Sequence, residues 1–195
     1  MSRDVYALVL AAGLSRRYGR SKLLEELSGM PLLRHALTAA QAACRGKVVL
    51  VTGHASEDMA SAASGLADAV VLNSEYQSGI GSSIARGVSH LVEDAAAVII
   101  MLADQPLVTA AHIGQMIEKW RNNPDVIVAT RYSGVDGPPV LFGHSYFPQL
   151  RELESDAGAR HVLRAHRAAV RTVEFEQAAI DIDTPDDLKA LLSQC

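Results

Sequence analysis

A short cationic loop that contains glycine is the segment of this chain best suited to chemistry. Residues 10–22 are Leu-Ala-Ala-Gly-Leu-Ser-Arg-Arg-Tyr-Gly-Arg-Ser-Lys, and they follow an apolar run, Val5 to Leu10, that is typical of a buried strand. Small residues after a strand let a ligand approach the backbone, whose N–H groups can bind an anion. Arg17 and Lys22 supply positive charge to neutralise that anion. The pattern predicts a phosphate-binding loop, although it fits neither the P-loop nor the dinucleotide fingerprint G-x-G-x-x-G.

Two aspartates later in the chain follow apolar segments, and the first of them is a candidate for metal binding. Asp104 comes just after the run Ala97–Leu102, at the sheet edge that would also carry the loop. Mg²⁺ typically takes one or two protein carboxylates together with substrate phosphates, so Asp104 is well placed for it. A turn aspartate that caps local N–H groups is an equally good interpretation of this segment. Asp183 ends the segment Ile180–Asp183, which we expect to be a short strand, and ordinary turn chemistry before Thr-Pro also explains it.

A glycine- and serine-containing segment is a third candidate. Gly79 and Gly81 predict a flexible turn, and Ser82 or Ser83 is expected to cap the helix that follows. Capping alone would explain both serines without a ligand.

The elements that must position these residues alternate between strand and helix. The expected strands are Val5–Leu10, Lys47–Val51, Ala69–Leu72, Ala97–Leu102, Val126–Thr130 and Val170–Phe175, and the expected helices are Pro31–Ala43, one from about Ser56, Ser82–Val92, Thr109–Asn122, Ser145–Leu153, Gly158–His166 and Asp186–Ser193. Such repetition predicts an α/β fold with a mostly parallel, doubly wound sheet, in one domain over residues 1–195. Ligands of such sheets bind at the carboxyl ends of the strands, where the cationic loop lies.

Composition excludes several function classes. The chain has 195 residues, 49% of them apolar, and a net charge of −4, which argues against a nucleic-acid or anionic-membrane surface. No apolar run approaches the roughly 20 residues that span a bilayer. We expect no signal peptide, and the two cysteines, Cys44 and Cys195, favour a cytoplasmic protein without a disulfide or a zinc site. The seven histidines are expected to be surface or site-lining residues.

The loop resembles L-A-A-G-x-S-x-R-M-G-x-x-K, the signature of the MobA-like NTP-transferase domain family. Eight positions match in order, and Tyr18 stands where the pattern has Met: Leu10, Ala11, Ala12, Gly13, Ser15, Arg17, Gly19 and Lys22. Later segments resemble further motifs of the family, namely L-x-D-Q-P at 102–106, N-x-x-x-x-x-G-M-x-S-S from residue 73, G-x-P-V-L-F at 137–142, G-D-x-G-A-R at 155–160 and D-I-D-T-P-E-D-L at 181–188. Pro138 and Ser155 depart from the residues usual in relatives, and both lie where the second substrate should bind.

The resemblance is nearest to the molybdenum cofactor cytidylyltransferases, and it implies a three-layer, Rossmann-like nucleotidyltransferase fold. The implied reaction transfers CMP from CTP to the terminal phosphate of molybdopterin, with Mg²⁺ as cofactor and pyrophosphate as product. The resemblance assigns catalysis to Arg17, Lys22 and Asp104, the metal to Asp104 and Asp183, the nucleotide to residues 10–13, Ser15, Arg17, Lys22, Gly81, Ser82 and Ser83, and the acceptor to Pro138, Asp156 and Arg160. A molybdoenzyme or its maturation chaperone is the implied protein partner.

Three alternatives stay open at this point. Another nucleotidyltransferase of the same fold would use GTP or a different acceptor, although Ala12-Gly13 in the loop favours the cytidylyl group. Some relatives act as pigment or quinone oxidoreductases, and the missing G-x-G-x-x-G argues only against a Rossmann-type NAD site. The third alternative is a carrier protein that binds molybdenum cofactor for a partner dehydrogenase and catalyses no reaction.

Overall fold

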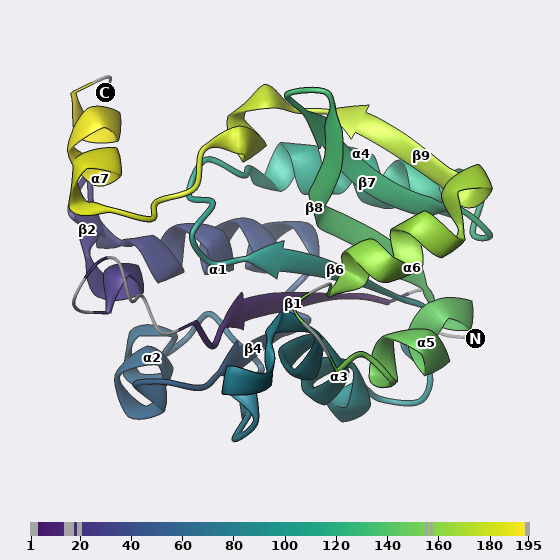
Figure 1. The fold of residues 1–195 in the computed structure, drawn as a ribbon, viewed down its shortest axis with the longest axis horizontal. Helices are drawn as coiled ribbons and strands as arrows, with labels where there is room; N and C mark the ends of the chain where they lie inside the picture. Colours follow the sequence, from purple (N-terminus) through teal and green to yellow (C-terminus); the bar gives the residue numbers. More distant parts are fainter. Residues whose placement is uncertain (1–3, 14–17, 19–20, 155, 157, 194–195) are drawn as a thin grey trace.

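A seven-stranded sheet forms the middle layer of the computed structural model, which describes residues 4–13, 18, 21–154, 156 and 158–193. The strand order is β5-β4-β1-β6-β8-β7-β9, and every strand except β8 runs parallel to β1 (Figure 1). The strands are β1 (Val5–Ala11), β4 (Val48–Thr52), β5 (Ala69–Leu72), β6 (Ala97–Leu102), β7 (Ile127–Tyr132), β8 (Val135–Gly143) and β9 (Val170–Glu174). The predicted α/β fold with a mostly parallel sheet is confirmed.

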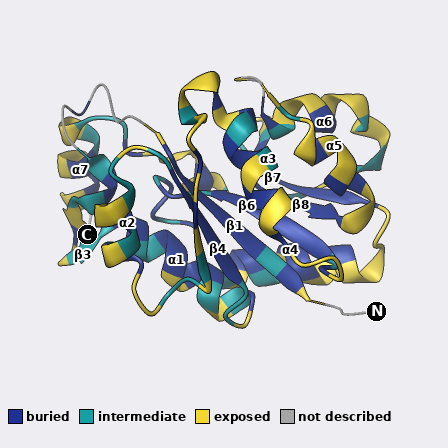
Figure 2. Ribbon diagram, turned by 90° about the horizontal axis from the view of Figure 1, so that it is seen from below, coloured by how far each residue is buried: buried dark blue, intermediate teal, exposed yellow. Residues whose placement is uncertain are grey.

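Helices cover both faces of this sheet and make three layers. The helices are α1 (Leu32–Ala43), α2 (Ser56–Ala62), α3 (Ile80–His90), α4 (Ala110–Asn122), α5 (Phe147–Arg151), α6 (Ala159–Ala165) and α7 (Pro185–Leu192). Buried side chains of α1, α2 and α4 pack on one face, and those of α3, α5 and α6 pack on the other. The central strands are therefore apolar on both sides and fully enclosed, as Figure 2 shows in dark blue.

A smaller apolar cluster joins α7 to a two-stranded hairpin of β2 (Glu26–Leu27) and β3 (Met30–Pro31). Tyr18 lies in this cluster, which agrees with its expected apolar position. Short 3₁₀ segments complete the chain: η1 (Lys22–Leu24), η2 (Tyr76–Ser78), η3 (His144–Tyr146), η4 (Arg167–Ala169) and η5 (Glu176–Ala179). Among the helices that the structure describes, none has the length and apolar character to cross a bilayer.

The order of the strands reverses between β1 and β6. From β1 the chain builds β4 and then β5 on one side, and α3 carries it back to β6 on the other side of β1. Open α/β sheets bind ligands at such a switch point, outside the carboxyl ends of the strands. The arrowheads of β1 and β6 point to the same end of the molecule, the end that carries α7 (Figure 1).

Several sequence-based boundaries are wrong. The segment Ile180–Asp183 is not a strand, because Ile182 is buried in the α7 cluster and not in the sheet. The turn-rich stretch before Val140 belongs to the long strand β8, which pairs antiparallel with both β6 and β7. Helix α3 begins at Ile80, so Ser82 and Ser83 lie within its first turn and do not cap it.

Candidate active site

A cleft of about 560 Å³ opens at the carboxyl ends of β1 and β6. It therefore lies at the switch point of the sheet, where the fold predicts a ligand. Its described lining comes from β1 and the residues after it, η1, η2, the start of α3, the end of β6 and the segments that precede α6 and α7: Leu10, Ala11, Ala12, Gly13, Lys22, Leu23, Tyr76, Gln77, Gly79, Ile80, Ser83, Leu102, Asp104, Asp156 and Asp183.

Lys22 joins the two candidate metal-binding aspartates. Its Nζ lies 2.8 Å from Asp104 Oδ2 and 2.8 Å from Asp183 Oδ1. The lysine side chain is 11% exposed, and the Asp104 and Asp183 side chains are 23% and 39% exposed. Three residues that are far apart in the sequence thus form one ionic cluster at the floor of the cleft.

Backbone hydrogen bonds bring the two aspartates together. The Ala103 N–H donates to Leu10 O at 3.2 Å, which ties the end of β6 to the end of β1. The Ile182 N–H donates to Asp104 O at 3.0 Å, which places Asp183 beside Asp104. Burial of the Ile182 side chain among the residues of the α7 cluster holds this contact in place.

The start of α7 fixes the backbone of Asp183. The Asp187 carboxylate accepts the N–H groups of Asp183, at 3.0 Å, and Thr184, at 2.7 Å. The Thr184 hydroxyl in turn accepts the Asp187 N–H at 3.2 Å, which completes a capping box. Thr184 is therefore the N-cap of α7, with Pro185 in the first turn. It orients the backbone at Asp183 as well as beginning a helix.

The charges of this cluster shift two pKa values. Burial lowers the pKa of Lys22, but the attraction and hydrogen bonds of Asp104 and Asp183 outweigh burial and raise it above its usual value. Lys22 is therefore an ammonium at neutral pH. Burial raises the pKa of Asp181, and repulsion from Asp104 and Asp183 raises it further. Asp181 is exposed and is not part of the cleft lining, and because no strand forms at this segment, its place does not follow from strand alternation.

The donor set fits a divalent cation bound with phosphates. Asp104 Oδ1 is buried and has no hydrogen-bond partner among the described residues. An unpartnered carboxylate oxygen in a polar cleft is the donor that Mg²⁺ or Mn²⁺ prefers. No group of three His, Cys, Asp or Glu side chains forms a metal cage in the described ranges. A metal on Asp104 and Asp183 would therefore depend on substrate oxygens for its remaining ligands.

Asn73 organises the start of α3 beside the cleft. Its Nδ2 donates to the hydroxyls of Ser82 and Ser83, both at 3.0 Å, and its Oδ1 accepts the Glu75 N–H at 3.0 Å. Ser82 Oγ also donates to Gly79 O at 2.8 Å, so this hydroxyl stabilises the turn that precedes α3. Ser83 lines the cleft, whereas Gly81 and Ser82 are not part of its lining.

The remaining predicted site residues divide between the cleft and its surroundings. Residues 10–13 and Asp156 line the cleft, whereas Pro138 and Arg160 are not part of its lining. An added Cβ at Gly13 would meet no atom of the described residues within 4 Å. Ser15 and Arg17, which were predicted to bind the nucleotide, lie outside the described residues.

Tyr76, Gln77 and Ile80 also line the cleft, and the sequence analysis did not assign them. The Tyr76 ring packs over Gly53, where an added Cβ would lie 2.6 Å from Tyr76 Cγ. A glycine at the end of β4 thus leaves room for an aromatic face beside the cleft. An aromatic residue just before the Gly-x-Gly turn was the available sequence signal.

Buried polar side chains contact the backbone carbonyls of Pro138 and Pro139, a segment that contains the predicted acceptor residue Pro138. Thr130 Oγ1 donates to Pro139 O at 2.8 Å and lies 2.9 Å from His112 Nε2. Gln105, next to Asp104 in the sequence, donates from Nε2 to Ala178 O at 2.7 Å and lies 3.5 Å from Pro138 O. His112 is 2% exposed and does not line the cleft, so the prediction of a surface or site-lining residue is wrong for it.

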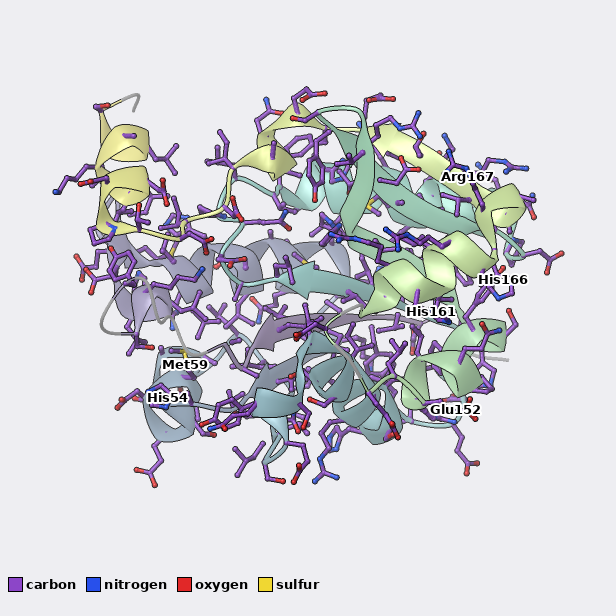
Figure 3. The ribbon with its side chains drawn as sticks, viewed as in Figure 1. His54, Met59, Glu152, His161, His166 and Arg167 are labelled. Atoms are coloured by element: carbon purple, nitrogen blue, oxygen red, sulfur yellow. The ribbon has the colours of Figure 1, made fainter. Side chains whose placement is uncertain are left out.

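The other histidines are half-buried or exposed, as expected. Figure 3 labels His54 beside α2 and labels His161 and His166 at the opposite end of the molecule. These three imidazoles therefore do not share a site.

Comparison with known proteins assigns this fold and cleft to a family. A model of the MobA-like NTP transferase domain matches residues 7–170. The chain is 30% identical over 204 residues to nicotine blue oxidoreductase from Paenarthrobacter nicotinovorans, with 96% of each chain covered. It is 29% identical over 189 residues to the purine catabolism protein PucB from Bacillus subtilis, with 91% of each covered.

Solved structures give the same result for the fold. Rv0371c from Mycobacterium tuberculosis superposes with a TM-score of 0.83 at 28% identity, covering 97% of this chain and 98% of that one. A second structure of Rv0371c is a complex with manganese, with a TM-score of 0.79 at 26% identity and coverage of 98% and 100%. Molybdopterin-guanine dinucleotide biosynthesis protein A from Archaeoglobus fulgidus shares the fold, with a TM-score of 0.72 at 18% identity and coverage of 97% and 98%.

Proposed function

The chain belongs to the MobA-like NTP transferase domain family, a family of nucleotidyltransferases, and from this premise we propose a specific reaction for it. It transfers CMP from CTP to a terminal phosphate of molybdopterin cofactor, with Mg²⁺ as the metal. An oxygen of the acceptor phosphate attacks the α-phosphorus of CTP and forms the new P–O bond. The bond from that phosphorus to the bridging oxygen breaks, and pyrophosphate leaves with the electron pair.

One observation carries the proposal. At the switch-point cleft Lys22 Nζ lies 2.8 Å from an oxygen of Asp104 and 2.8 Å from an oxygen of Asp183, and a buried oxygen of Asp104 has no partner among the described residues. A cation and two carboxylates in one cleft are the groups that phosphoryl transfer requires, because positioning and charge neutralisation dominate such reactions.

The residues of the chain have separate tasks in this reaction. Lys22 and Arg17 bind the triphosphate and stabilise the negative charge that develops on the α-phosphate and on the leaving pyrophosphate. Asp104 and Asp183 would hold Mg²⁺, which when bound neutralises phosphate charge. Among the described lining residues one lysine faces three aspartates, so a triphosphate needs a further cation to enter. The attacking phosphate is already ionised and requires no general base.

The base and the acceptor are expected to contact different residues. Residues 10–13 and Ser15 are expected to bind the phosphates and ribose, and Ser83 with the start of α3 is expected to contact the base. Tyr76 offers an aromatic face on which a base can stack. The small residues Ala12 and Gly13 favour CTP over GTP by their family resemblance. Pro138, Asp156 and Arg160 are the proposed acceptor contacts.

An oxidoreductase is the second candidate, because nicotine blue oxidoreductase is similar to this chain over 96% of both lengths. Dependence on a divalent metal separates the two functions, since a nucleotidyltransferase loses all turnover without one. The experiment therefore compares CTP, GTP and ATP binding with and without Mg²⁺ by thermal unfolding.

Saturation at about 100 times Kd stabilises a protein by about 2.7 kcal/mol, which is a rise in Tm of roughly 5–10 °C for a chain of this size. We expect this rise with CTP and Mg²⁺, and turnover of CTP when molybdopterin is added. Asp104→Asn should fold normally and lose about 10²-fold or more in turnover, as is common when one pre-organised charge is removed.

The matched control is Asp186→Asn, which makes the same chemical change on a carboxylate whose side chain is 88% exposed on α7. It should keep wild-type turnover. A preference for GTP would move the protein to a guanylyl reaction. Wild-type turnover in Asp104→Asn, or no response to any nucleotide, would refute the proposal and favour the redox function or a carrier.

A further inference from the structure

Lys22 occupies the position between Asp104 and Asp183 that a bound cation would take. Its Nζ contacts Asp104 Oδ2 and Asp183 Oδ1 at the same distance of 2.8 Å. Charge-assisted hydrogen bonds of this length are the strong ones. In this arrangement the ammonium neutralises one of the two carboxylate charges without any metal.

We propose that Lys22 is the resting counterion of this carboxylate pair, and that the site accepts its metal only together with a phosphate-bearing ligand. The ligand that enters is then a metal–polyphosphate complex and not the free ion. This inference rests on the proposed function, which assigns the metal to Asp104 and Asp183 and the phosphates to Lys22.

Electrostatic repulsion opposes a free metal ion at this site. A divalent cation on the two carboxylates would lie within a few ångströms of the Lys22 ammonium, and repulsion at such a distance is large in a partly buried cleft. The ammonium must therefore move away when the metal enters. Because the lysine side chain is only 11% exposed, moving it without a new anionic partner leaves a poorly hydrated charge, which is costly.

A polyphosphate removes this obstacle. Its oxygens would give Lys22 a new anionic partner inside the same cleft and would supply the ligands that two carboxylates cannot. Asp104 Oδ1 also favours an incoming metal. Lys22 contacts only Oδ2 of that carboxylate, so Oδ1 is left without a partner among the described residues. The loading of metal and the transfer of Lys22 to phosphate are therefore a single coupled step.

The test measures Mn²⁺ binding to the whole chain without nucleotide, by the electron paramagnetic resonance signal of free Mn²⁺. Lys22→Met keeps the length and the apolar stem of the side chain and removes the ammonium. We expect Lys22→Met to bind Mn²⁺ at least tenfold more tightly than the wild type. Lys22→Met combined with Asp104→Asn should lose this gain.

Lys189→Met is the matched control. Lys189 also contacts an aspartate, Asp186, at 3.0 Å, but its side chain is 75% exposed on α7. The change in net charge is the same, so a general charge effect would strengthen Mn²⁺ binding in both variants. We expect the gain in the Lys22 variant alone, and equal Mn²⁺ affinity in the wild type and Lys22→Met would overturn the proposal.

A second measurement uses the wild type and so does not depend on how the variant folds. The ¹H–¹⁵N signal of the Lys22 ammonium should stay unchanged when Mg²⁺ is added alone, and should shift when Mg²⁺ is added with inorganic tripolyphosphate. A shift with Mg²⁺ alone would overturn the proposal. Neither measurement uses CTP or molybdopterin, so a wrong base or acceptor leaves this test intact.

Discussion

Replacing His112 by glutamine should make the stability of the protein less dependent on pH between about 4 and 6.5. His112 is buried on α4, stacks on Phe175 with 4.4 Å between the ring centroids, and lies 2.9 Å from Thr130 Oγ1. The Thr130 hydroxyl donates its proton to Pro139 O, so it accepts a hydrogen bond from His112 Nε2. We therefore assign the proton of the neutral ring to Nε2, and Nδ1 is left buried without a partner among the described residues.

The magnitude follows from the pKa. Burial lowers the pKa of His112 from 6.5 to about 4, because protonation would place a charge and a second N–H where no acceptor is available. The unfolded chain therefore binds a proton at this residue below pH 6.5, whereas the folded chain does not until about pH 4. Stability falls as the pH drops through this window. The full shift corresponds to about 3 kcal/mol, most of which is lost between pH 7.5 and 4.5.

The assay is unfolding by urea at pH 7.5, 6.5, 5.5 and 4.5. At pH 7.5 His112→Gln should be less stable than the wild type, since it loses the stacking on Phe175, which is worth about 1 kcal/mol. This difference should shrink and then reverse by pH 4.5. The matched control is His161→Gln, which removes an exposed imidazole from α6. Parallel stability curves for the wild type and His112→Gln would refute the assigned tautomer and the burial argument.

Two glycines give further predictions. Gly87→Ala should destabilise the protein by about 1–3 kcal/mol in urea unfolding, because its Cβ would lie 2.8 Å from Val51 Cγ2 and collide with Leu8 in a packed core; unchanged stability would contradict the packing. Gly53→Ala should weaken CTP binding measured by calorimetry. The new Cβ would lie 2.6 Å from Tyr76 Cγ, so the Tyr76 ring would have to move. Unchanged affinity would exclude Tyr76 from the base site.

The sheet could be predicted from the sequence where burial on both faces makes a strand continuously apolar, as in Ala97–Leu102. Strand β8 could not be predicted in full, because Gly137, Pro138 and Pro139 resemble a turn. The structure accommodates the prolines where the pairing of β7 and β8 shifts register between Ala129 and Thr130, which is where a strand tolerates proline. Pairing between distant segments leaves no local pattern.

The place of His112 could have been found from the sequence. Ile113, Met116 and Trp120 are buried at helical spacing, and His112 lies on the same face of α4. Because imidazole is polar, His112 was predicted to be a surface or site-lining residue and not part of that buried face. Its partner Thr130 lies on another element, so the hydrogen bond itself has no signal in the sequence.

The ionic cluster shows why site residues are easier to find than their contacts. Asp104 and Asp183 each sit in a motif, but they meet only because the Ile182 N–H bonds to Asp104 O and the Ile182 side chain is buried against α7. The predicted strand at 180–183 does not form, yet Asp183 still lies in the cleft beside Asp104. Asp181 is exposed and does not line the cleft, but repulsion from Asp104 and Asp183 adds to burial in raising its pKa. The third carboxyl group increases the negative potential at the cleft floor, and this potential favours a cation there, whether the ammonium of Lys22 or a metal.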